Sequence, residues 1–584
     1  MPHPTDERPH EARLRVFLRL ALRYAMLGAA LAAPAASAET LRLDLTQAPQ
    51  AQDILPGPAT NGWSYTGTVQ EGPASALVPV PGSYLGPTIH AGQGDNLTIR
   101  LTNLIGEDST THWHGLDVPD RMDGHPRFAF ASGSTYEYSF RVLNRAGTYW
   151  YHPHPDMRTG GQVYAGLAGF FIVHDAQESS LNLPGGDFDL PLCIQDASFD
   201  AGNQRVYNPD MTNGFFGTTI LVNGKPDYVQ SAATRVYRLR LLNGSVSRIY
   251  KLAFSNGMPL VVIGNDGGLI DVPRPYPYVM LAPGERVELW ADFRGEAPGS
   301  QVTLRSLAFN SSGGQGAALD IMRFSIDHAQ AGTETLPATL STITPYQLAD
   351  AINAANPKLY AIAMAMVGGN MSFTLNGATF STTAVAANEV AMCNTLEVIA
   401  VSNTSGMMPI PHPIHFHGRQ FQILDRKVTS GGLAGWNTVK DGLVDAGWKD
   451  TFLIMPGETV RLLVRHGGYP GLYNYHCHNL EHEDMGMMRN FRLDANPDTP
   501  CDLNFADASY APVSPAKTEP WVYTKTCAGG DVLPELLVPS VAPGSDVDNL
   551  GGGPGTMRLY QLSCGCAKGI YLSKQAGRVR LDNF

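Results

Sequence analysis

Residues 475–488, "YHCHNLEHEDMGMM", gather three histidines, one cysteine, three methionines and three carboxylates into fourteen positions. Cys477 is the only cysteine of the chain that has a histidine on each side. Imidazole nitrogen, thiolate and thioether sulfur are ligands of transition metals in proteins. The stretch therefore predicts a metal centre, and its His-x-His spacing predicts the local fold.

The His-x-His spacing occurs four times in the chain. Of 17 histidines, ten fall in the opening stretch and in "HWHG" (112–115), "YHPHPD" (151–156) and "HPIHFHG" (412–418). On a β-strand, residues i and i+2 point to the same face, about 7 Å apart. Each pair is therefore expected to project two imidazoles from one face: His112 with His114, His152 with His154, His415 with His417, and His476 with His478. The other seven histidines are isolated and need no function: His3, His10, His90, His125, His174, His328 and His466.

Eight imidazoles on four strands exceed the need of a single ion, since one zinc ion takes four ligands. The count fits a cluster of three ions that carry three, three and two imidazoles. A purely structural zinc site would leave Cys477 and the methionines beside it unexplained, because thioether sulfur is not a usual ligand of zinc.

Cys477 is expected to point to the opposite face of its strand from His476 and His478. Its thiolate can then bind a second metal, together with His412, His482 and a methionine just beyond. Two histidines, one cysteine and a weakly bound methionine form the blue-copper ligand set, which suits rapid electron transfer. An electron would travel from the cysteine to a neighbouring histidine through a few bonds of the backbone.

The rest of the sequence favours an all-β protein. Apolar and polar residues alternate in "TYEYSFRV" (135–142) and "VYRLRLL" (236–242), and 61 Gly and 42 Pro supply turns. A turn-plus-strand phrase recurs as "AGQGDNLTIRL" (91–101), "APGERVELWADF" (282–293) and "MPGETVRLLVRH" (455–466), which indicates three copies of one β-sandwich unit. We place the units at 39–177, 178–334 and 359–496. A linker with one short helix occupies 335–358, and a tail of unknown role occupies 497–584.

Composition and charge narrow the class of protein. Hydrophobic residues make up 43% and charged residues 16%, as in a folded protein, and the formal net charge is −12 without a basic cluster. Nucleic acid is therefore not an expected partner. Residues 1–38 are typical of an export signal: four arginines precede an apolar run at 24–33, and "ASA" (36–38) offers a cleavage site. The apolar run is shorter than the ~20 residues of a membrane span. We expect a periplasmic or secreted protein without a membrane span, and the route of export stays open.

The cysteines other than Cys477 predict no further metal site. Cys193 and Cys393 lie in apolar runs and are expected to be small buried thiols. Export permits disulfides in the tail, where three pairings of four cysteines are possible. These four are Cys501, Cys527, Cys564 and Cys566.

The four histidine segments resemble those of the multicopper oxidases, the family of laccases, bilirubin oxidases and cuprous oxidases. They occur in the family's order, and the resemblance covers about residues 45–495. "HWHGLDVPDRMDG" (112–124), "TGGQVYAGLAG" (159–169), "GNDGGLI" (264–270) and "WKDT" (448–451) are also similar to bacterial members. The resemblance implies three consecutive cupredoxin-like Greek-key domains. It also implies an oxidoreductase with four copper ions: one type 1, one type 2 and two type 3.

The resemblance assigns a copper ion to each candidate ligand. The type 1 copper would be bound by His412, Cys477, His482 and Met487, since the family keeps its axial ligand ten residues past the cysteine. The type 2 copper would be bound by His112 and His415. The type 3 pair would be bound by His114, His152, His154, His417, His476 and His478.

Two carboxylates, Asp123 and Glu483, occupy positions that the family uses for proton delivery. Reduction of dioxygen to two waters consumes four protons in a site closed to bulk solvent, and a carboxyl group with a raised pKa can supply them. The alternative is that each carboxylate only orients a ligand histidine through a hydrogen bond.

We expect the electron donor to be a small molecule that binds near His412 and His482. We favour phenols and aromatic amines, as for a laccase. The alternative donor is Cu(I), which methionine sulfur attracts, although Met408 stands where copper-efflux relatives have an acidic residue and no dense Met- and His-rich insert is present. The methionines nearest to the motif in sequence are Met364, Met366, Met371, Met407 and Met408.

Two other classes of protein fit the sequence less well. A metal-free cupredoxin-fold scaffold would not need the complete set of ligands. A two-domain copper nitrite reductase would lack the third domain and would not need both pairs of histidine motifs. We expect a monomer that uses dioxygen and a small reducing substrate.

Overall fold

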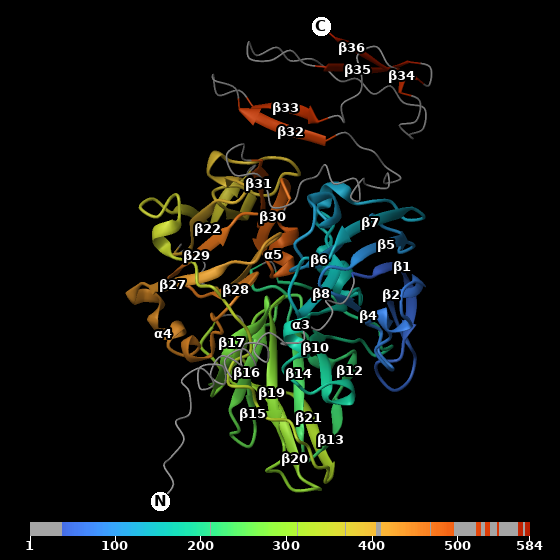
Figure 1. The fold of residues 1–584 in the computed structure, drawn as a ribbon, viewed down its shortest axis with the longest axis vertical. Helices are drawn as coiled ribbons and strands as arrows, with labels where there is room; N and C mark the ends of the chain where they lie inside the picture. The colour runs from blue at the N-terminus through green and yellow to red at the C-terminus, as the bar shows by residue number, and fades with distance from the viewer. Residues whose placement is uncertain are drawn as a thin grey trace, which may run out of the picture. The chain divides into compact units, whose positions relative to one another are not determined.

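The structure is a computed structural model that describes residues 38–495, except 211, 312–313, 368–369, 405–409 and 468, and five short strands between 521 and 583. Strands dominate the described chain and its helices are short (Figure 1). No described helix is both long and apolar enough to cross a bilayer. Residues 1–37 of the predicted export signal, Met407, Met408 and the four tail cysteines lie outside the described residues.

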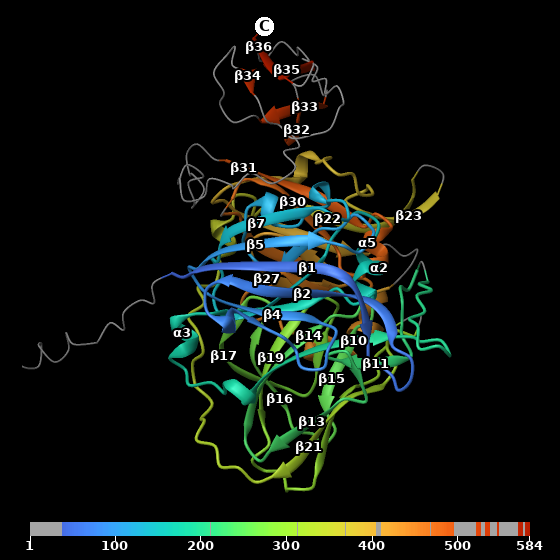
Figure 2. The ribbon, with the colours of Figure 1, turned by 90° about the vertical axis from the view of Figure 1, so that its right-hand side faces the viewer.

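The first sandwich consists of two sheets with strand orders β2-β1-β5-β7 and β3-β4-β9-β8-β6. Figure 2 shows the blue strands of the first sheet side by side. Ile99, Trp113, Tyr138 and Phe171 are buried in the core between the two sheets. The strands are β1 (Thr40–Gln52), β2 (Thr60–Glu71), β3 (Leu77–Val78), β4 (Gly86–Gly92), β5 (Asn96–Asn103), β6 (Thr111–His114), β7 (Thr135–Arg141), β8 (Gly147–Pro153) and β9 (Gly169–His174). The helices are η1 (Ala74–Ala76), η2 (Asp120–Met122), η3 (Pro126–Phe128), α2 (Thr159–Tyr164) and α3 (Ala176–Ser179).

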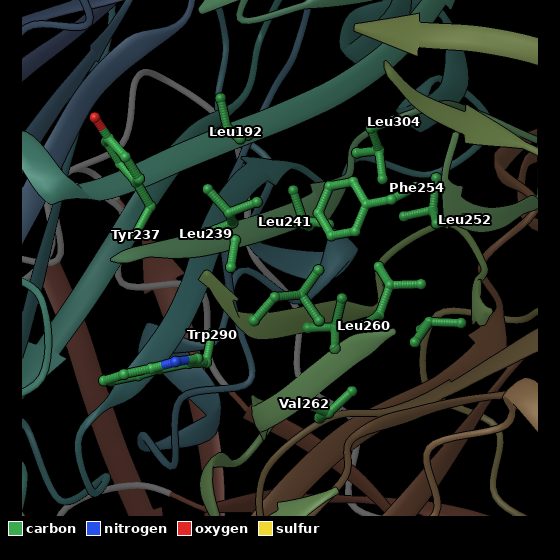
Figure 3. Packing of buried hydrophobic residues seen from close by; sticks show 14 of the residues in the cluster. Leu192, Tyr237, Leu239, Leu241, Leu252, Phe254, Leu260, Val262, Trp290 and Leu304 are labelled. Atoms are coloured by element: carbon green, nitrogen blue, oxygen red, sulfur yellow. The ribbon is translucent and has the colours of Figure 1, made fainter. Parts of the chain in front are cut away.

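The middle sandwich has sheets of order β12-β11-β10-β14-β19-β16-β17 and β13-β21-β20-β15-β18. Figure 3 shows its core, in which Leu239, Leu241, Phe254, Leu260 and Trp290 pack together. The strands are β10 (Asp189–Ala197), β11 (Thr219–Val222), β12 (Lys225–Pro226), β13 (Val229–Ala233), β14 (Val236–Asn243), β15 (Tyr250–Phe254), β16 (Leu260–Asn265), β17 (Gly268–Tyr276), β18 (Val279–Leu281), β19 (Arg286–Asp292), β20 (Gln301–Ser306) and β21 (Leu319–His328), and η4 (Gly186–Phe188) precedes them.

The third sandwich has sheets of order β23-β22-β25-β29-β27 and β24-β31-β30-β26-β28. Its strands are β22 (Lys358–Val367), β23 (Asn370–Leu375), β24 (Val390–Met392), β25 (Leu396–Asn403), β26 (His412–Phe416), β27 (Gln422–Val428), β28 (Thr451–Ile454), β29 (Glu458–Arg465), β30 (Gly471–Cys477) and β31 (Met488–Asp494). Its helices are η6 (Ala387–Glu389), η7 (Ser430–Gly432), α4 (Leu433–Trp436), η8 (Lys440–Gly442) and α5 (Leu480–Asp484). The predicted linker contains a single turn of helix, η5 (Leu348–Asp350).

The tail contains short strands that the sequence did not predict. β32 (Trp521–Thr526) pairs with β33 (Val532–Leu537), and β36 (Arg578–Asn583) pairs with β34 (Asp546–Val547) and β35 (Ile570–Gln575).

The three sandwiches repeat one arrangement, as the sequence predicted. In each, the first strand runs parallel to a second strand, which pairs antiparallel with a third: β1-β5-β7, β10-β14-β19 and β22-β25-β29. The second strand of each trio ends in a buried asparagine, Asn103, Asn243 or Asn403, whose amide donates a hydrogen bond to a carbonyl of the following loop. These asparagines are a repeat signal that the sequence analysis missed.

The three repeated phrases do not all occupy the same position in their sheets. The phrases at 282–293 and 455–466 form β19 and β29, which occupy the third position of their trios, whereas the phrase at 91–101 forms β5, which occupies the second. The three phrases look alike because each strand follows a glycine with positive φ, at Gly94, Gly284 and Gly457. A tight turn into a half-buried strand needs this pattern at any position in the sheet.

Cys393 also differs from the prediction. It is disulfide-bonded, whereas Cys193 is a free, buried thiol as expected. An apolar run predicts burial, and a half-cystine is buried among apolar residues as readily as a free thiol.

Candidate metal centre

Four strands carry the His-x-His pairs to one buried place. In the first sandwich β6 pairs with β8, which places His112 opposite His152. In the third sandwich β26 pairs with β30, which places His415 opposite His476. The other four imidazoles follow at i+2 on the same faces. All eight are buried.

The two strand pairs face each other, although they lie some 300 residues apart in the chain. The Nε2 atoms of His112 and His415 are 3.3 Å apart, and those of His154 and His476 are 3.2 Å apart. The Nε2 atom of His417 lies 3.1 Å from that of His476. We call these eight side chains the imidazole cluster.

The imidazole cluster divides into groups whose ligand atoms lie within 4.8 Å of one another. Two groups share no member, and a third joins the remaining His112 and His415 with His114. The eight imidazoles can therefore be divided as three, three and two, which is the division expected from their number. The two separate groups are His114, His152 and His478, and His154, His417 and His476.

Cys477 belongs to a different group, which we call the thiolate site. Its Sγ lies 3.4 Å from Nδ1 of His412 and 3.7 Å from Nδ1 of His482. In the register of β26 and β30, Cys477 is opposite Ile414 in the core of the third sandwich, whereas His476 is opposite His415. The alternation of the strand thus sends adjacent side chains to two sites, as the sequence predicted.

The structure also brings Met487 close to Cys477. Met487 is fully buried in the same core, and its carbonyl accepts a hydrogen bond of 3.0 Å from the backbone N–H of Cys477. The eleven predicted histidine and cysteine ligands thus lie at the two sites, and the backbone of Met487 is hydrogen-bonded to Cys477.

Comparison with known proteins identifies the family. Residues 64–178 and 351–497 match two family models, each described as multicopper oxidase. The multicopper oxidase mco of Staphylococcus haemolyticus is 31% identical over 413 residues, which cover 70% of this chain and 83% of that protein. The chain belongs to the multicopper oxidase family.

Other relatives share this architecture. A laccase of Bacillus subtilis is 29% identical over 474 residues, which cover 71% of this chain and 90% of that protein. The crystal structure of the multicopper oxidase McoA from the hyperthermophile Aquifex aeolicus matches with a TM-score of 0.66 at 33% identity, and covers 79% of this chain and 97% of that one. The three sandwiches are accordingly cupredoxin-like domains, and the chain is an oxidoreductase of the copper-dependent kind.

The imidazole cluster fits the copper ions that multicopper oxidases bind. Burial, and then the other imidazoles nearby, lower the pKa of His152, His415 and His478 well below the ordinary value, so their lone pairs stay available. Nε2 of His152 and both ring nitrogens of His478 are buried without a hydrogen-bond partner among the described residues. A buried cation would satisfy these atoms, which otherwise carry a cost of burial.

The thiolate site fits copper for a related reason. Burial raises the pKa of the Cys477 thiol, so its thiolate requires a cation beside the sulfur. Burial also lowers the pKa of His412 and His482, the latter to about 4. Two neutral imidazoles and a thiolate suit copper better than zinc when a methionine is the remaining ligand.

The two predicted carboxylates both contact imidazoles of the cluster. Nδ1 of His417 donates to Oδ2 of Asp123 at 2.7 Å, and Nδ1 of His112 donates to the Asp123 carbonyl at 2.6 Å. Burial raises the pKa of Asp123 to about 6, although His112 opposes this shift. Asp123 is therefore tied to both strand pairs of the imidazole cluster.

Glu483, which lies in α5, contacts two other imidazoles of the cluster. Its Oε2 lies 3.0 Å from Nδ1 of His476, and its Oε1 lies 3.6 Å from Nε2 of His154. Burial raises its pKa, but these two histidines outweigh burial and bring the pKa to about 2. The surroundings thus raise the pKa of Asp123 and lower the pKa of Glu483.

His482 is covered on the side away from Cys477. Its Nε2 donates to the Thr212 carbonyl at 2.9 Å, and the ring of Phe373 lies 4.2 Å from its own. Thr212 belongs to a turn of the middle sandwich that Asp210 and Gly214 close through two backbone hydrogen bonds. No part of the imidazole is open to solvent.

Several hydrogen-bond partners of the ligands, Asp450, Thr451 and Thr212, were not expected from the sequence. Asp450 and Thr451 touch two histidines of the cluster, and they lie in "WKDT", which was noted only as a family phrase. Thr212 touches His482 from 270 residues away, and no local pattern signals such a contact.

Proposed function

We propose that the protein is a laccase-like multicopper oxidase, which removes single electrons from phenols or aromatic amines and reduces dioxygen to water. The observation that carries the proposal is the position of Cys477, whose sulfur lies in the thiolate site while His476 and His478, its neighbours in the chain, lie in the imidazole cluster. This arrangement joins a one-electron site to a multi-electron site by covalent bonds.

The proposal assigns four copper ions to these side chains. His412, Cys477, His482 and Met487 would hold the type 1 ion, and His112 and His415 would hold the type 2 ion. The type 3 pair would be held by His114, His152 and His478 on one side and by His154, His417 and His476 on the other, the two groups that share no member. When bound, the copper ions supply the capacity to accept electrons one at a time and to deliver four to dioxygen.

Asp123, whose pKa burial raises to about 6, is proposed to hold and deliver the protons that the reaction consumes. Glu483, whose pKa is lowered, is proposed to pass protons on as a carboxylate rather than to store them. Each contacts two imidazoles of the cluster, so each lies where protons are needed. Both are buried, so bulk water does not reach the imidazole cluster directly past them. The hydrogen bonds of Asp123 also orient His417 and His112, and the two roles of this residue are separated by an experiment below.

Electrons are proposed to enter at His482. The Thr212 carbonyl covers Nε2 of this histidine, and Thr212 and Asn213 are partly exposed. A donor that rests on the turn at 210–214 is therefore separated from the imidazole by one hydrogen bond. Such a route selects donors by their reduction potential and by whether they can reach the turn, and not by their fit to a deep pocket. This selection supports a broad range of phenols and amines as donors.

Cu(I) oxidation is the second candidate, because methionines lie on the hairpin beside the thiolate site. Phe373 of β23 packs on His482, and its partner across the hairpin is Met364. Met366, the next residue on the same face of β22, is 63% exposed. Thioether sulfur prefers Cu(I). The hairpin therefore offers a soft metal ion a route toward His482.

An oxygen electrode distinguishes these candidates. The protein, loaded with copper, is given a phenol, a non-phenolic dye or Cu(I) stabilised by a weak chelator, and oxygen uptake is measured. The laccase-like proposal expects the phenol and the dye to be oxidised without added copper ions. If only Cu(I) supports oxygen uptake, or if the dye is oxidised only when copper ions are added, the second candidate replaces it. We also propose that the protein is exported, which residues 1–38 support, and that it is a monomer.

A further inference from the structure

Arg286 joins all three sandwiches at one buried point. It begins β19 in the middle sandwich, which supplies none of the candidate ligands. Its Nε donates to the Thr148 carbonyl of the first sandwich at 3.0 Å, and its Nη2 donates to the Asp266 carbonyl of its own sandwich at 2.8 Å. Its Nη1 and Nη2 donate to the two carboxylate oxygens of Asp450, in the third sandwich, at 2.7 and 2.5 Å. A bidentate pair of this kind fixes a carboxylate in both position and rotation.

Asp450 in turn contacts two imidazoles of the cluster. Its Oδ1 lies 3.1 Å from Nε2 of His114, and its carbonyl accepts a hydrogen bond of 2.9 Å from Nδ1 of His415. Thr451 supports both contacts, because its Oγ1 lies 3.1 Å from each of these nitrogens and donates to Oδ1 of Asp450 at 2.9 Å. The hydrogen bonds that run from Arg286 through Asp450 therefore reach one histidine of the first sandwich, His114, and one of the third, His415.

These contacts determine which nitrogen of each ring carries the proton. On His114 the acceptors face Nε2, so the proton is held there and the lone pair is left on Nδ1. That Nδ1 is buried and has no hydrogen-bond partner among the described residues. On His415 the acceptors face Nδ1, so the lone pair is left on Nε2, 3.3 Å from Nε2 of His112. The hydrogen bond that one ring nitrogen makes decides which nitrogen remains for a metal.

Gly115 packs so closely against Arg286 and Asp450 that no side chain fits at this position. A Cβ on Gly115 would lie 2.5 Å from Oδ2 of Asp450 and 2.8 Å from Nη2 of Arg286, and Gly115 has a φ of +89°. Both charged side chains are fully buried. Without Arg286, the Asp450 carboxylate would be a buried charge with fewer partners, which is strongly unfavourable.

We propose that Arg286, acting through Asp450, is a positioning residue that sets the tautomers of His114 and His415 and so aims Nδ1 of one ring and Nε2 of the other at the metal cluster. The middle sandwich thereby controls the imidazole cluster without contributing a ligand. The proposal rests on the proposed function in taking these histidines as copper ligands, but the tautomers themselves are a property of the metal-free protein.

The test compares the variants Asp450→Asn, Arg286→Met and Arg286→Lys with the original protein. The control is Arg426→Met, which breaks a partly buried pairing of Arg426 with Asp445 and Glu458 in the third sandwich. This pairing touches no candidate ligand. Nitrogen-15 NMR of the metal-free proteins reports the tautomers of His114 and His415. Copper content, the visible band of the thiolate site and the electron paramagnetic resonance signals report the loaded proteins.

We expect Asp450→Asn and Arg286→Met to populate both tautomers of His114 and to weaken copper binding at the imidazole cluster by roughly 10–100-fold, with the visible band of the thiolate site retained. Arg286→Lys should restore the tautomer in part. Original tautomers and copper content in Asp450→Asn, or the same changes in Arg426→Met, would overturn the inference. If the original protein binds no copper, the proposed function fails. The tautomer measurement on the metal-free protein still tests the role of Arg286 and Asp450. Asp450→Asn keeps the shape of the side chain, so it serves where Arg286→Met does not fold.

Discussion

Cys477 and His476 are consecutive in the chain, yet their side chains lie in two different metal sites. The sulfur lies 3.4 Å from Nδ1 of His412, whereas Nε2 of His476 lies 3.1 Å from Nε2 of His417. The two sites are thus connected by the backbone of adjacent residues, and Nδ1 of His476 also donates a hydrogen bond of 3.1 Å to the Cys477 carbonyl. Because the two sites share no ligand, a substitution can alter one of them while the other keeps all of its ligands.

Replacing Cys477 by serine should abolish the visible thiolate-to-copper band and lower the oxidation of every donor by more than about 10³-fold. The oxygen of serine is a poor copper ligand at neutral pH, so the thiolate site loses its electron-transfer properties. Absorption spectra and oxygen uptake measure the two effects. Copper should remain in the imidazole cluster.

Cys193→Ser is the matched control, because Cys193 is the other free and buried cysteine of the described chain. It lies in a separate core cluster and touches no candidate ligand. Its variant should keep both the colour and the activity. A visible band that survives in Cys477→Ser would disprove the assignment of the sulfur ligand.

Asp123→Asn should slow turnover by about 10²–10⁴-fold, the usual range for the loss of a general acid. The amide can still accept a hydrogen bond from His417, so the geometry is kept while the exchangeable proton is lost. Stopped-flow spectroscopy separates the steps: bleaching of the visible band by a donor without oxygen should be unchanged, and its return on addition of oxygen should be slow.

Asp123→Glu, which retains a carboxyl group, should recover part of the rate of reoxidation. If Asp123→Asn reoxidises at the original rate, proton delivery by Asp123 is wrong, and the carboxylate only orients His417.

Gly214→Ala should displace the turn that covers His482. An added Cβ would lie 2.1 Å from Oγ of Ser247, and Gly214 has a φ of +84°. Loss of the Thr212 carbonyl would make the imidazole a weaker donor to copper and should raise the reduction potential of the thiolate site. The rise is on the order of 50 mV, or about a tenfold change in a one-electron equilibrium. Redox titration of the visible band measures the potential.

Gly185→Ala is the control for this prediction, since a Cβ at Gly185 meets no atom within 4 Å. Its potential and activity should match the original. An unchanged potential in Gly214→Ala would mean that Thr212 does not influence electron entry.

The stability of the protein should fall as the pH decreases from about 6.5 to about 4, in part because of His90. Burial, and then the neighbouring His174, lower the pKa of His90 to about 4. Between this value and the unfolded value of about 6.5, the unfolded chain binds a proton that the folded chain does not, so stability is lost as the pH falls.

His90→Gln should reduce the difference in free energy of unfolding between pH 7 and pH 4.5 by about 2 kcal/mol. Chemical denaturation at the two pH values measures this difference. His328→Gln is the control, because His328 is exposed on β21. Equal pH dependence in the two variants would show that His90 is not responsible.

The predictable part of this molecule is the part that depends on local geometry. The i, i+2 alternation of a strand is a property of neighbouring residues, so the two faces around Cys477 and the grouping of the histidines followed from spacing. The three sandwiches followed from alternation and turns. The proposal of Met487 as the axial ligand, by contrast, came from resemblance.

The parts that sequence analysis missed depend on distant contacts. Arg286 and Asp450 are 164 residues apart, and neither lies in a pattern that points to the other. Thr212 acts through its carbonyl, which every residue has, so its identity carries no signal. The disulfide of Cys393 was missed because burial does not distinguish a thiol from a half-cystine.

The separation of His112 and His415 by 303 residues has a consequence for biosynthesis. At roughly 5–20 residues per second, a ribosome needs about 15–60 s to add the second after the first. During that interval the early imidazoles are exposed to whatever ions surround the nascent chain, without the partners that would select among them. The imidazole cluster can therefore bind its ions only after the third sandwich is made. Until then, other ions can compete for the histidines of the first sandwich.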